Sequence, residues 1–362
     1  NDTPCPKPIL KAAEVALRTG KTYYTSSVGM IELREEVCKK LKRDNGLDYT
    51  PGQVVCSNGA KQSIMQLVTA LVSPSDQVII PAPYWTSYPD ICRMAGCDPV
   101  IVRTEAKDDY QMSPAQLEAA ITPRTRALIL CSPSNPTGSV YPKEKLEALA
   151  KVLERHPRVF VISDEIYEYI TYEGATHTSF ASLPHMYERT AVVNGFSKGF
   201  AMTGFRLGYV AAPLKVAKLC AKVQGQITSC PCSISQHAGV AALRMGMKPV
   251  KEMIQDFSAK RQYVLDSLNK IKGVICARPM GAFYVLPQIS AYYGRMTPDK
   301  KQMISDSTAF CKHLLSEYKV ALVPGIGFGD DRCIRISYAG AMSDLEEAMT
   351  RLKKCLESLV EA

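Results

Sequence analysis

Short apolar runs alternate with helical segments between about residues 53 and 215, and this order constrains the fold more than any other feature of the chain. Most of these runs lack the alternation of apolar and polar residues seen in strands with one wet face, so both of their faces are expected to be buried. Strands separated by helices predict an α/β fold with a mostly parallel sheet. The seven expected strands are 53–56, 77–80, 99–102, 127–131, 159–163, 191–194 and 207–211, and the helices between them are 61–72, 84–95, 114–121 and 142–154.

The pattern changes in the last third of the chain. A long helical region reaches about residue 270, and mixed strands and helices follow it, which predicts a second, smaller α+β domain. The expected strands there are 273–277, 282–286, 320–323 and 334–337, with helices at 304–318 and from residue 343. We therefore expect an N-terminal segment over 1–20 that packs with the small domain, a large domain over 21–250 and the small domain over 251–362.

Composition excludes several classes of protein. Lys and Arg number 44 against 35 Asp and Glu, but they form no dense basic block, so nucleic-acid binding is not expected. No run of eighteen apolar residues is present, so we expect no membrane span. Thirteen scattered cysteines and five histidines without metal-ligand spacing predict a soluble protein of a reducing compartment that holds no metal.

The segment from Val192 to Tyr209 carries the strongest chemical signal. An apolar run ends there in Ser197 and Lys198, and Arg206 follows eight positions after the lysine. A lysine at the end of a buried strand is costly unless it is desolvated for a purpose, and a desolvated amine attacks carbonyl groups. Ser197 and Arg206 could bind a phosphate beside this amine. An amine next to a phosphate site suggests pyridoxal phosphate, whereas the alternative is an ordinary surface lysine.

Two further strand ends carry residues suited to a planar anionic ligand. Small residues after the first strand, from Ser57 to Ala60, open a helix whose first N–H groups could bind a phosphate. The only tryptophan, Trp85, lies at the corner after the second strand and could stack on a ring. Turn geometry explains the first feature equally well, and a place in the core explains the second.

Three polar residues end or interrupt other apolar strands. Asn135 lies in a loop bracketed by prolines, which would aim its side chain, or the loop is a plain turn with a possible cis X-Pro bond. Asp164 ends a buried strand, where an unpaired carboxylate is expensive; it could bind a protonated pyridine nitrogen or cap a helix. Arg335 lies inside an apolar strand, paired with an internal acid or free to bind a substrate carboxylate.

These features occur in one order that resembles the class I/II aminotransferases, the fold-type I pyridoxal-phosphate enzymes. The resemblance runs from about residue 2 to the end. Its motifs are Ser57-Asn58-Gly59-Ala60-Lys61, Pro83-Tyr84-Trp85, Ser134-Asn135-Pro136-Thr137-Gly138, Ser163-Asp164-Glu165-Ile166-Tyr167, Ser197-Lys198 with Met202-Thr203-Gly204 and Arg206, Gly281-Ala282-Phe283-Tyr284, and Arg335. Segments 132–143 and 175–184 resemble the plastid bifunctional aspartate/prephenate aminotransferases of plants and algae.

The resemblance implies pyridoxal 5′-phosphate as cofactor, held in the large domain, and Lys198 as the amine that bonds to it. It implies that Asp164 pairs with the ring nitrogen, and that Tyr167 and Asn135 bind the ring oxygen. Lys198, Asp164 and Tyr167 are thus the implied catalytic residues. The other implied cofactor-binding residues are Gly59, Ala60, Lys61, Trp85, Ser197 and Arg206, together with Tyr24 from the neighbouring subunit of a homodimer.

The implied reaction moves an amino group between aspartate or glutamate and 2-oxo acids such as oxaloacetate, 2-oxoglutarate and prephenate. By the same resemblance, Arg335 binds the substrate α-carboxylate and Lys61 its distal carboxylate, with Trp85 and Asn135 completing the substrate site. A lyase, or an aromatic or alanine aminotransferase of the same fold, is the alternative enzyme. A regulator that reuses the fold is the non-enzymatic one.

The family's glycine-containing substrate loop lies just before the segment that resembles residues 1–4, so we expect this lid to be absent here. The chain begins with Asn1, which suggests a processed or trimmed form. The subgroup resemblance implies the plastid stroma, with the cytoplasm as the alternative location.

Overall fold

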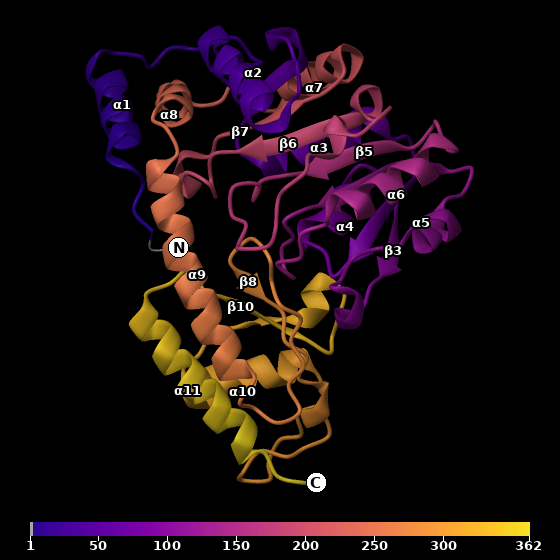
Figure 1. Cartoon of the computed structure of the whole chain (residues 1–362), viewed down its shortest axis with the longest axis vertical. Coiled ribbons are helices and arrows are strands. Elements are labelled where there is room, and N and C mark those ends of the chain that lie inside the picture. The colour runs from indigo at the N-terminus through magenta and orange to yellow at the C-terminus, as the bar shows by residue number, and fades with distance from the viewer. Residues whose placement is uncertain (1–2) are drawn as a thin grey trace.

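A computed structural model describes residues 3–362. Its larger part is built on a seven-stranded sheet in the order β1-β7-β6-β5-β4-β2-β3 (Figure 1). Neighbouring strands are parallel, except that β7 runs antiparallel to both β1 and β6. The strands are β1 (Val54–Ser57), β2 (Gln77–Ala82), β3 (Asp98–Arg103), β4 (Thr125–Cys131), β5 (Phe160–Asp164), β6 (Thr190–Gly195) and β7 (Gly208–Ala211). The predicted seven-stranded, mostly parallel sheet is confirmed.

Helices cover both faces of this sheet, as the continuously apolar strands require. One face packs against α3 (Ala60–Leu71), α4 (Ser87–Met94) and α7 (Leu214–Ile227). The other packs against α5 (Pro114–Ala120) and α6 (Lys143–Glu154) at one end, and against α2 (Ile31–Asn45) and α8 (Ser233–Arg244) at the other. Within β2, the side chain of Ile79 lies in one core, whereas those of Val78 and Ile80 lie in the other.

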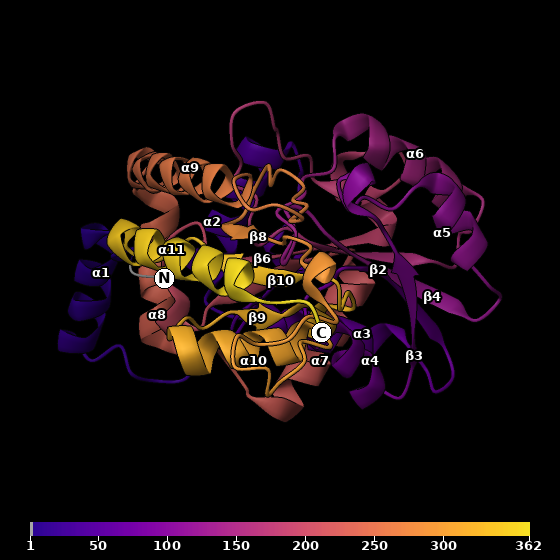
Figure 2. The same ribbon diagram turned by 90° about the horizontal axis from the view of Figure 1, so that it is seen from below.

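A second sheet of three antiparallel strands lies below the first in Figure 1. Its order is β8 (Tyr284–Val285), β10 (Ile334–Ser337) and β9 (Val323–Pro324). It shares a core with α9 (Lys248–Leu268), α10 (Ser307–Tyr318) and α11 (Met342–Ser358), and α9 and α11 lie side by side (Figure 2). Mixed strands and helices therefore follow the large sheet, as predicted.

Two expected strands of this part differ from the structure. No strand forms over 273–277, where Ile275 makes only an isolated bridge to Gln288, because the run has no neighbouring strand of its own length. The strand expected at 320–323 is replaced by β9, which begins only at Val323 and pairs with β10. Both segments were predicted as strands because they are apolar, but a segment forms a strand only where its backbone hydrogen-bonds to a neighbouring strand.

Helix α1 (Lys7–Arg18) stands beside α8 at the edge of the molecule (Figure 1). The residues that precede it, from Thr3 to Pro6, line a hollow next to α9 together with Lys7. The N-terminal segment therefore contacts α8, within the range assigned to the large domain, as well as the start of α9. The division at residues 20 and 250 stays a prediction. In residues 3–362, no helix is both long and apolar enough to cross a membrane.

Candidate active site

A cavity of about 360 Å³ opens where β4, β5 and β6 end, beside the N-terminus of α3. Ligands of open α/β sheets bind at the carboxyl ends of the strands, so this is the expected position for a site. The second sheet contributes one wall through Tyr284 and Arg335. The lining residues are Ala60, Lys61, Ile64, Trp85, Tyr88, Cys131, Asn135, Asp164, Ile166, Tyr167, Ser197, Lys198, Thr203, Arg206, Tyr284 and Arg335.

One end of the cavity is suited to an anion. Gly59 caps α3 at φ 87°, and a Cβ at this position would lie 2.6 Å from Nη2 of Arg206. Glycine therefore leaves room for the guanidinium beside the first turn of the helix, where free N–H groups and the helix dipole favour a phosphate. Arg206 donates to the carbonyl oxygen of Thr203 at 3.0 Å and forms no ion pair within residues 3–362. Ser197 lies at the same end.

Lys198 lies between this anion site and the aromatic floor of the cavity. Its Nζ is 5.3 Å from the ring centre of Phe283 and 5.7 Å from that of Tyr167. Burial lowers the pKa of Lys198, the charges of Arg335 and Arg206 lower it further, and the carboxylate of Asp164 opposes them. The amine is thus held toward its neutral, nucleophilic form.

Asp164 is the last residue of β5 and is almost completely buried. The hydroxyl of Tyr88 donates to its Oδ2 at 2.6 Å, and the backbone N–H of Ile166 donates to its Oδ1 at 3.3 Å. Burial raises the pKa of this carboxyl to about 6, although both hydrogen bonds oppose the shift. A carboxylate held in this way can pair with a cationic ring nitrogen, which would stabilise its charged form.

Aromatic and amide side chains line the opposite side. The ring of Trp85 meets that of Tyr88 edge to face, with centroids 5.4 Å apart, and Nζ of Lys61 lies 4.9 Å from the Trp85 ring. The hydroxyls of Tyr167 and Tyr284 are 3.1 Å apart. The indole of Trp85 can therefore stack on a planar ring, and the phenol hydroxyls can form hydrogen bonds with a ligand.

Arg335 extends from β10 into the cavity between two rings. Its guanidinium carbon lies 4.6 Å from the ring centre of Tyr284 and 4.8 Å from that of Phe328. Nη1 donates to the side-chain oxygen of Asn135 at 2.9 Å, whereas the buried Nε has no hydrogen-bond partner among the described residues. Within residues 3–362, no acid forms an ion pair with this arginine. A half-buried guanidinium with a free donor is suited to bind a carboxylate.

The structure brings together all but one of the residues singled out in the sequence. Gly59 lies directly behind Arg206, and the other ten line the cavity. Tyr24 does not: its side chain is 89% exposed, away from the cavity of its own chain. Sequence reasoning gave no role to Tyr88 or Tyr284, although Tyr284 lies in one of the motifs. Ser132-Pro133 and Asn135-Pro136 are cis.

These residues fit pyridoxal phosphate. The helix end with Ser197 and Arg206 would take the phosphate, the buried carboxyl of Asp164 the ring nitrogen, and Lys198 the aldehyde carbon. The unpartnered Nε of Arg335 leaves a donor for a substrate carboxylate.

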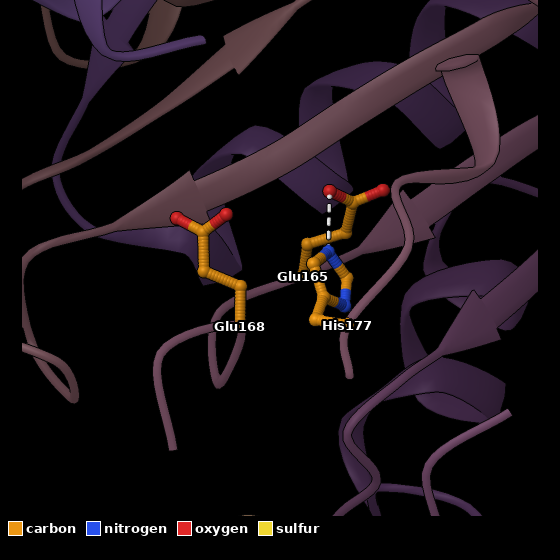
Figure 3. A group of neighbouring side chains, drawn as sticks. All are labelled: Glu165, Glu168 and His177. Atoms are coloured by element: carbon orange, nitrogen blue, oxygen red, sulfur yellow. Dashed lines mark hydrogen bonds and ion pairs between the residues drawn. The ribbon is translucent and has the colours of Figure 1, made fainter. Parts of the chain in front are cut away.

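A second cluster of titratable groups lies beside the site, on Glu165, Glu168 and His177 (Figure 3). Oε2 of Glu165 is 3.1 Å from Nε2 of His177. The other carboxylate oxygen of Glu165, Oε1, accepts hydrogen bonds from two serine hydroxyls. Glu168 pairs with the buried ammonium of Lys40 and accepts from Asn194 at 2.8 Å. Because protein donors already occupy both carboxylates, we interpret the cluster as a buried ion-pair network that anchors the ends of β5 and β6.

Comparison with known proteins agrees with this site. The sequence model of the family described as aminotransferase class I and II matches residues 1–352. A bifunctional aspartate aminotransferase and glutamate/aspartate-prephenate aminotransferase of Petunia hybrida is 52% identical over 99% of this chain and 75% of its own. An aspartate/prephenate aminotransferase of Cereibacter sphaeroides is 43% identical over 97% and 88%. The crystal structure of the Rhizobium meliloti aspartate aminotransferase superposes with a TM-score of 0.96 at 40% identity, covering 99% and 90%.

Fold and site together define an enzyme that transfers amino groups with pyridoxal phosphate. The chain belongs to the class I and II aminotransferases, and the resemblance seen in the sequence is confirmed.

Proposed function

We propose that the cavity is the active site of an aminotransferase that uses aspartate or glutamate as amino donor, and that accepts prephenate beside oxaloacetate and 2-oxoglutarate. The observation that carries this proposal is the half-buried guanidinium of Arg335, which has no acid partner within residues 3–362, in one cavity with the amine of Lys198. The names of the relatives from Petunia hybrida and Cereibacter sphaeroides support aspartate and prephenate as substrates.

The bound cofactor supplies an electrophilic carbon and an electron sink. Nζ of Lys198, held toward its neutral form, would accept the proton from the substrate Cα as general base and deliver it as general acid to the carbon that the cofactor's aldehyde group supplies. Asp164 holds the charge on the ring nitrogen. Arg335 binds the α-carboxylate by its fork of donors, so that the Cα–H bond lies near Nζ of Lys198.

The remaining site residues bind without taking part in proton transfer. Gly59, Ala60, Ser197 and Arg206 hold the phosphate, and Tyr167 and Asn135 bind the ring oxygen. Lys61 is exposed at the mouth of the cavity, where its ammonium can neutralise the distal carboxylate of a dicarboxylic substrate.

The direct test is the reaction of the purified protein, loaded with pyridoxal phosphate, with aspartate and 2-oxoglutarate. We expect oxaloacetate and glutamate in equal amounts, and transfer from glutamate to prephenate in a second assay. A lyase would consume aspartate without forming glutamate, and that result would overturn the proposal. An aromatic aminotransferase is the second candidate because the structure of such an enzyme from Pyrococcus horikoshii, 38% identical, has a TM-score of 0.92. Faster half-reactions with phenylalanine than with aspartate would favour it.

We further propose a homodimer in which Tyr24 reaches the phosphate of the partner subunit. Large apolar and aromatic side chains lie exposed on and near α1, which is the kind of surface that a partner covers. They are Leu10, Leu17, Tyr23, Tyr24 and Ile31. We also propose that the protein is located in the plastid stroma, as its resemblance to the plastid aminotransferases implies. Fractionation of the source cells would test this location.

A further inference from the structure

Among the described residues that line the cavity, Tyr88 is the only one whose side chain donates a hydrogen bond to the carboxylate of Asp164. It lies in the first turn of α4, and the carboxylate that it contacts ends β5, 76 positions later in the sequence. The phenol is 2% exposed, so water does not compete for its hydroxyl. A buried tyrosine needs a partner for this hydroxyl, and Tyr88 donates it to Oδ2 of Asp164, with the Cys131 thiol as a second neighbour.

The carboxylate is held on both oxygens, in two different ways. Oδ2 accepts a short bond of 2.6 Å from the phenol, whereas Oδ1 accepts a longer one of 3.3 Å from a backbone N–H. The backbone bond comes from Ile166, only two residues further along the chain, so it moves with the strand end. The tyrosine belongs to a separate helix and therefore fixes the carboxylate relative to the wall formed by Trp85.

The two aromatic residues of this wall are linked. Trp85 and Tyr88 lie one turn apart, their rings meet at 84°, and the N–H of Tyr88 donates to the carbonyl oxygen of Trp85 at 3.0 Å. The same short segment thus sets the plane on which a ring would stack and the direction of the acid that would face its nitrogen.

We propose that Tyr88 is a positioning residue, which orients the Asp164 carboxylate toward the ring nitrogen of the cofactor and keeps it ionised there. A donor to the carboxylate favours the charged form and offsets the cost of its burial. Without the hydroxyl, Asp164 would rotate and protonate more readily, and its pairing with the ring would weaken. This inference rests on the role proposed for Asp164.

The test uses Tyr88→Phe, which removes the hydroxyl and keeps the ring contact with Trp85. Tyr141→Phe is the matched control because this tyrosine is equally buried and its hydroxyl accepts from Met112 N–H at 2.7 Å, outside the cavity. Affinity of the apoprotein for pyridoxamine phosphate is read from the fluorescence of Trp85, the only tryptophan in the chain. We expect Tyr88→Phe to bind about 10-fold more weakly, as for the loss of one hydrogen bond to a charged group, and Tyr141→Phe to bind as the native protein does.

Both changes are then repeated in Asp164→Asn. If Tyr88 acts through Asp164, removing its hydroxyl has no further effect on affinity in that background. The turnover of aspartate by the loaded Tyr88→Phe enzyme should fall while its KM changes little, since Arg335 is untouched. Unchanged affinity of Tyr88→Phe, or an equal loss in the Asp164→Asn background, would overturn the inference. Failure of Asp164→Asn itself to weaken binding would instead remove the proposed role of Asp164, so the two failures are distinguishable.

Discussion

At the scale of single residues, the site gathers three charged groups that have lost their usual surroundings. Lys198 is partly buried and lies in the field of two arginines, Asp164 is buried and accepts a hydrogen bond from a phenol, and Arg335 forms no ion pair within residues 3–362. Holding each charged group without a partner costs folding free energy. In the proposed reaction an aldehyde reacts with Lys198, a cationic ring pairs with Asp164 and a carboxylate pairs with Arg335. Binding of the ligands therefore relieves this cost.

Asp164 gives this cost a pH dependence. Because its pKa is raised to about 6 by burial, the folded apoprotein binds the proton more tightly than the unfolded chain does. The penalty fades below about pH 4, as the unfolded chain also takes up the proton, and grows to about 3 kcal/mol as the pH rises through 6. We expect Asp164→Asn to raise the melting temperature of the apoprotein at pH 8 by a few degrees, with the gain vanishing toward pH 4. Asp109→Asn, at an exposed position, is the control. A gain independent of pH would contradict the burial argument.

Lys61 makes a prediction about substrates. Lys61→Ala should lower kcat/KM for aspartate and glutamate by at least about 10-fold, because a carboxylate then enters the cavity without its counter-ion. Alanine, which has no distal carboxylate, should lose much less. Half-reaction kinetics with the two donors measure the ratio, and Lys222→Ala on the exposed face of α7 serves as control. Equal losses for alanine and aspartate would remove the role of Lys61.

Lys198→Ala has the sharpest expected outcome. The cofactor should still bind, through the phosphate site and Asp164, but transamination should stop because no amine remains to carry the proton from Cα. Single-turnover assays and the fluorescence of Trp85 separate the two effects. Turnover at the native rate would show that another base does this work.

At the scale of elements, the start of α3 requires a glycine because Gly59 has a positive φ and lies against the guanidinium of Arg206. Gly59→Ala should destabilise the fold by about 1–3 kcal/mol through its positive φ, and its Cβ should also displace Arg206. We expect about 10-fold weaker binding of the cofactor. Gly96→Ala is the matched control, since Gly96 has φ 80° and nothing within 4 Å of its Cβ position. Weaker binding in both variants would point to general destabilisation.

Most helices and strands could be predicted from the sequence because buried segments are rich in apolar residues. The runs that became β4, β5 and β6 are continuously apolar, and the residues after them were identified as the site. The prediction of a strand at 273–277 was wrong because the residues of a segment do not show whether a neighbouring strand is available to pair with it. Tyr88 escaped notice because a tyrosine on the apolar face of a helix resembles a core residue, and its hydroxyl acquires meaning only when Asp164 is placed against it.

At the scale of the whole molecule, the role proposed for Tyr24 predicts that each active site is built from two chains. Co-expression of Tyr24→Ala chains with Lys198→Ala chains should yield hybrid dimers in which one site carries both changes and the other carries neither. Such hybrids, purified by two tags, should recover about half of the native activity. The two homodimers, which should be nearly inactive, are the controls. A hybrid no more active than their mean would place Tyr24 outside the partner's site.

The reversed strand β7 has a consequence for how this protein can change. Gly195 of β6 and Gly208 of β7 are paired across the sheet, so residues 196–207 form one loop closed at its base. That loop carries both Lys198 and Arg206. The separation of the amine from the guanidinium is therefore fixed by local chain length. A deletion or insertion there would shift both groups at once, whereas the whole loop could be exchanged between relatives as a cassette.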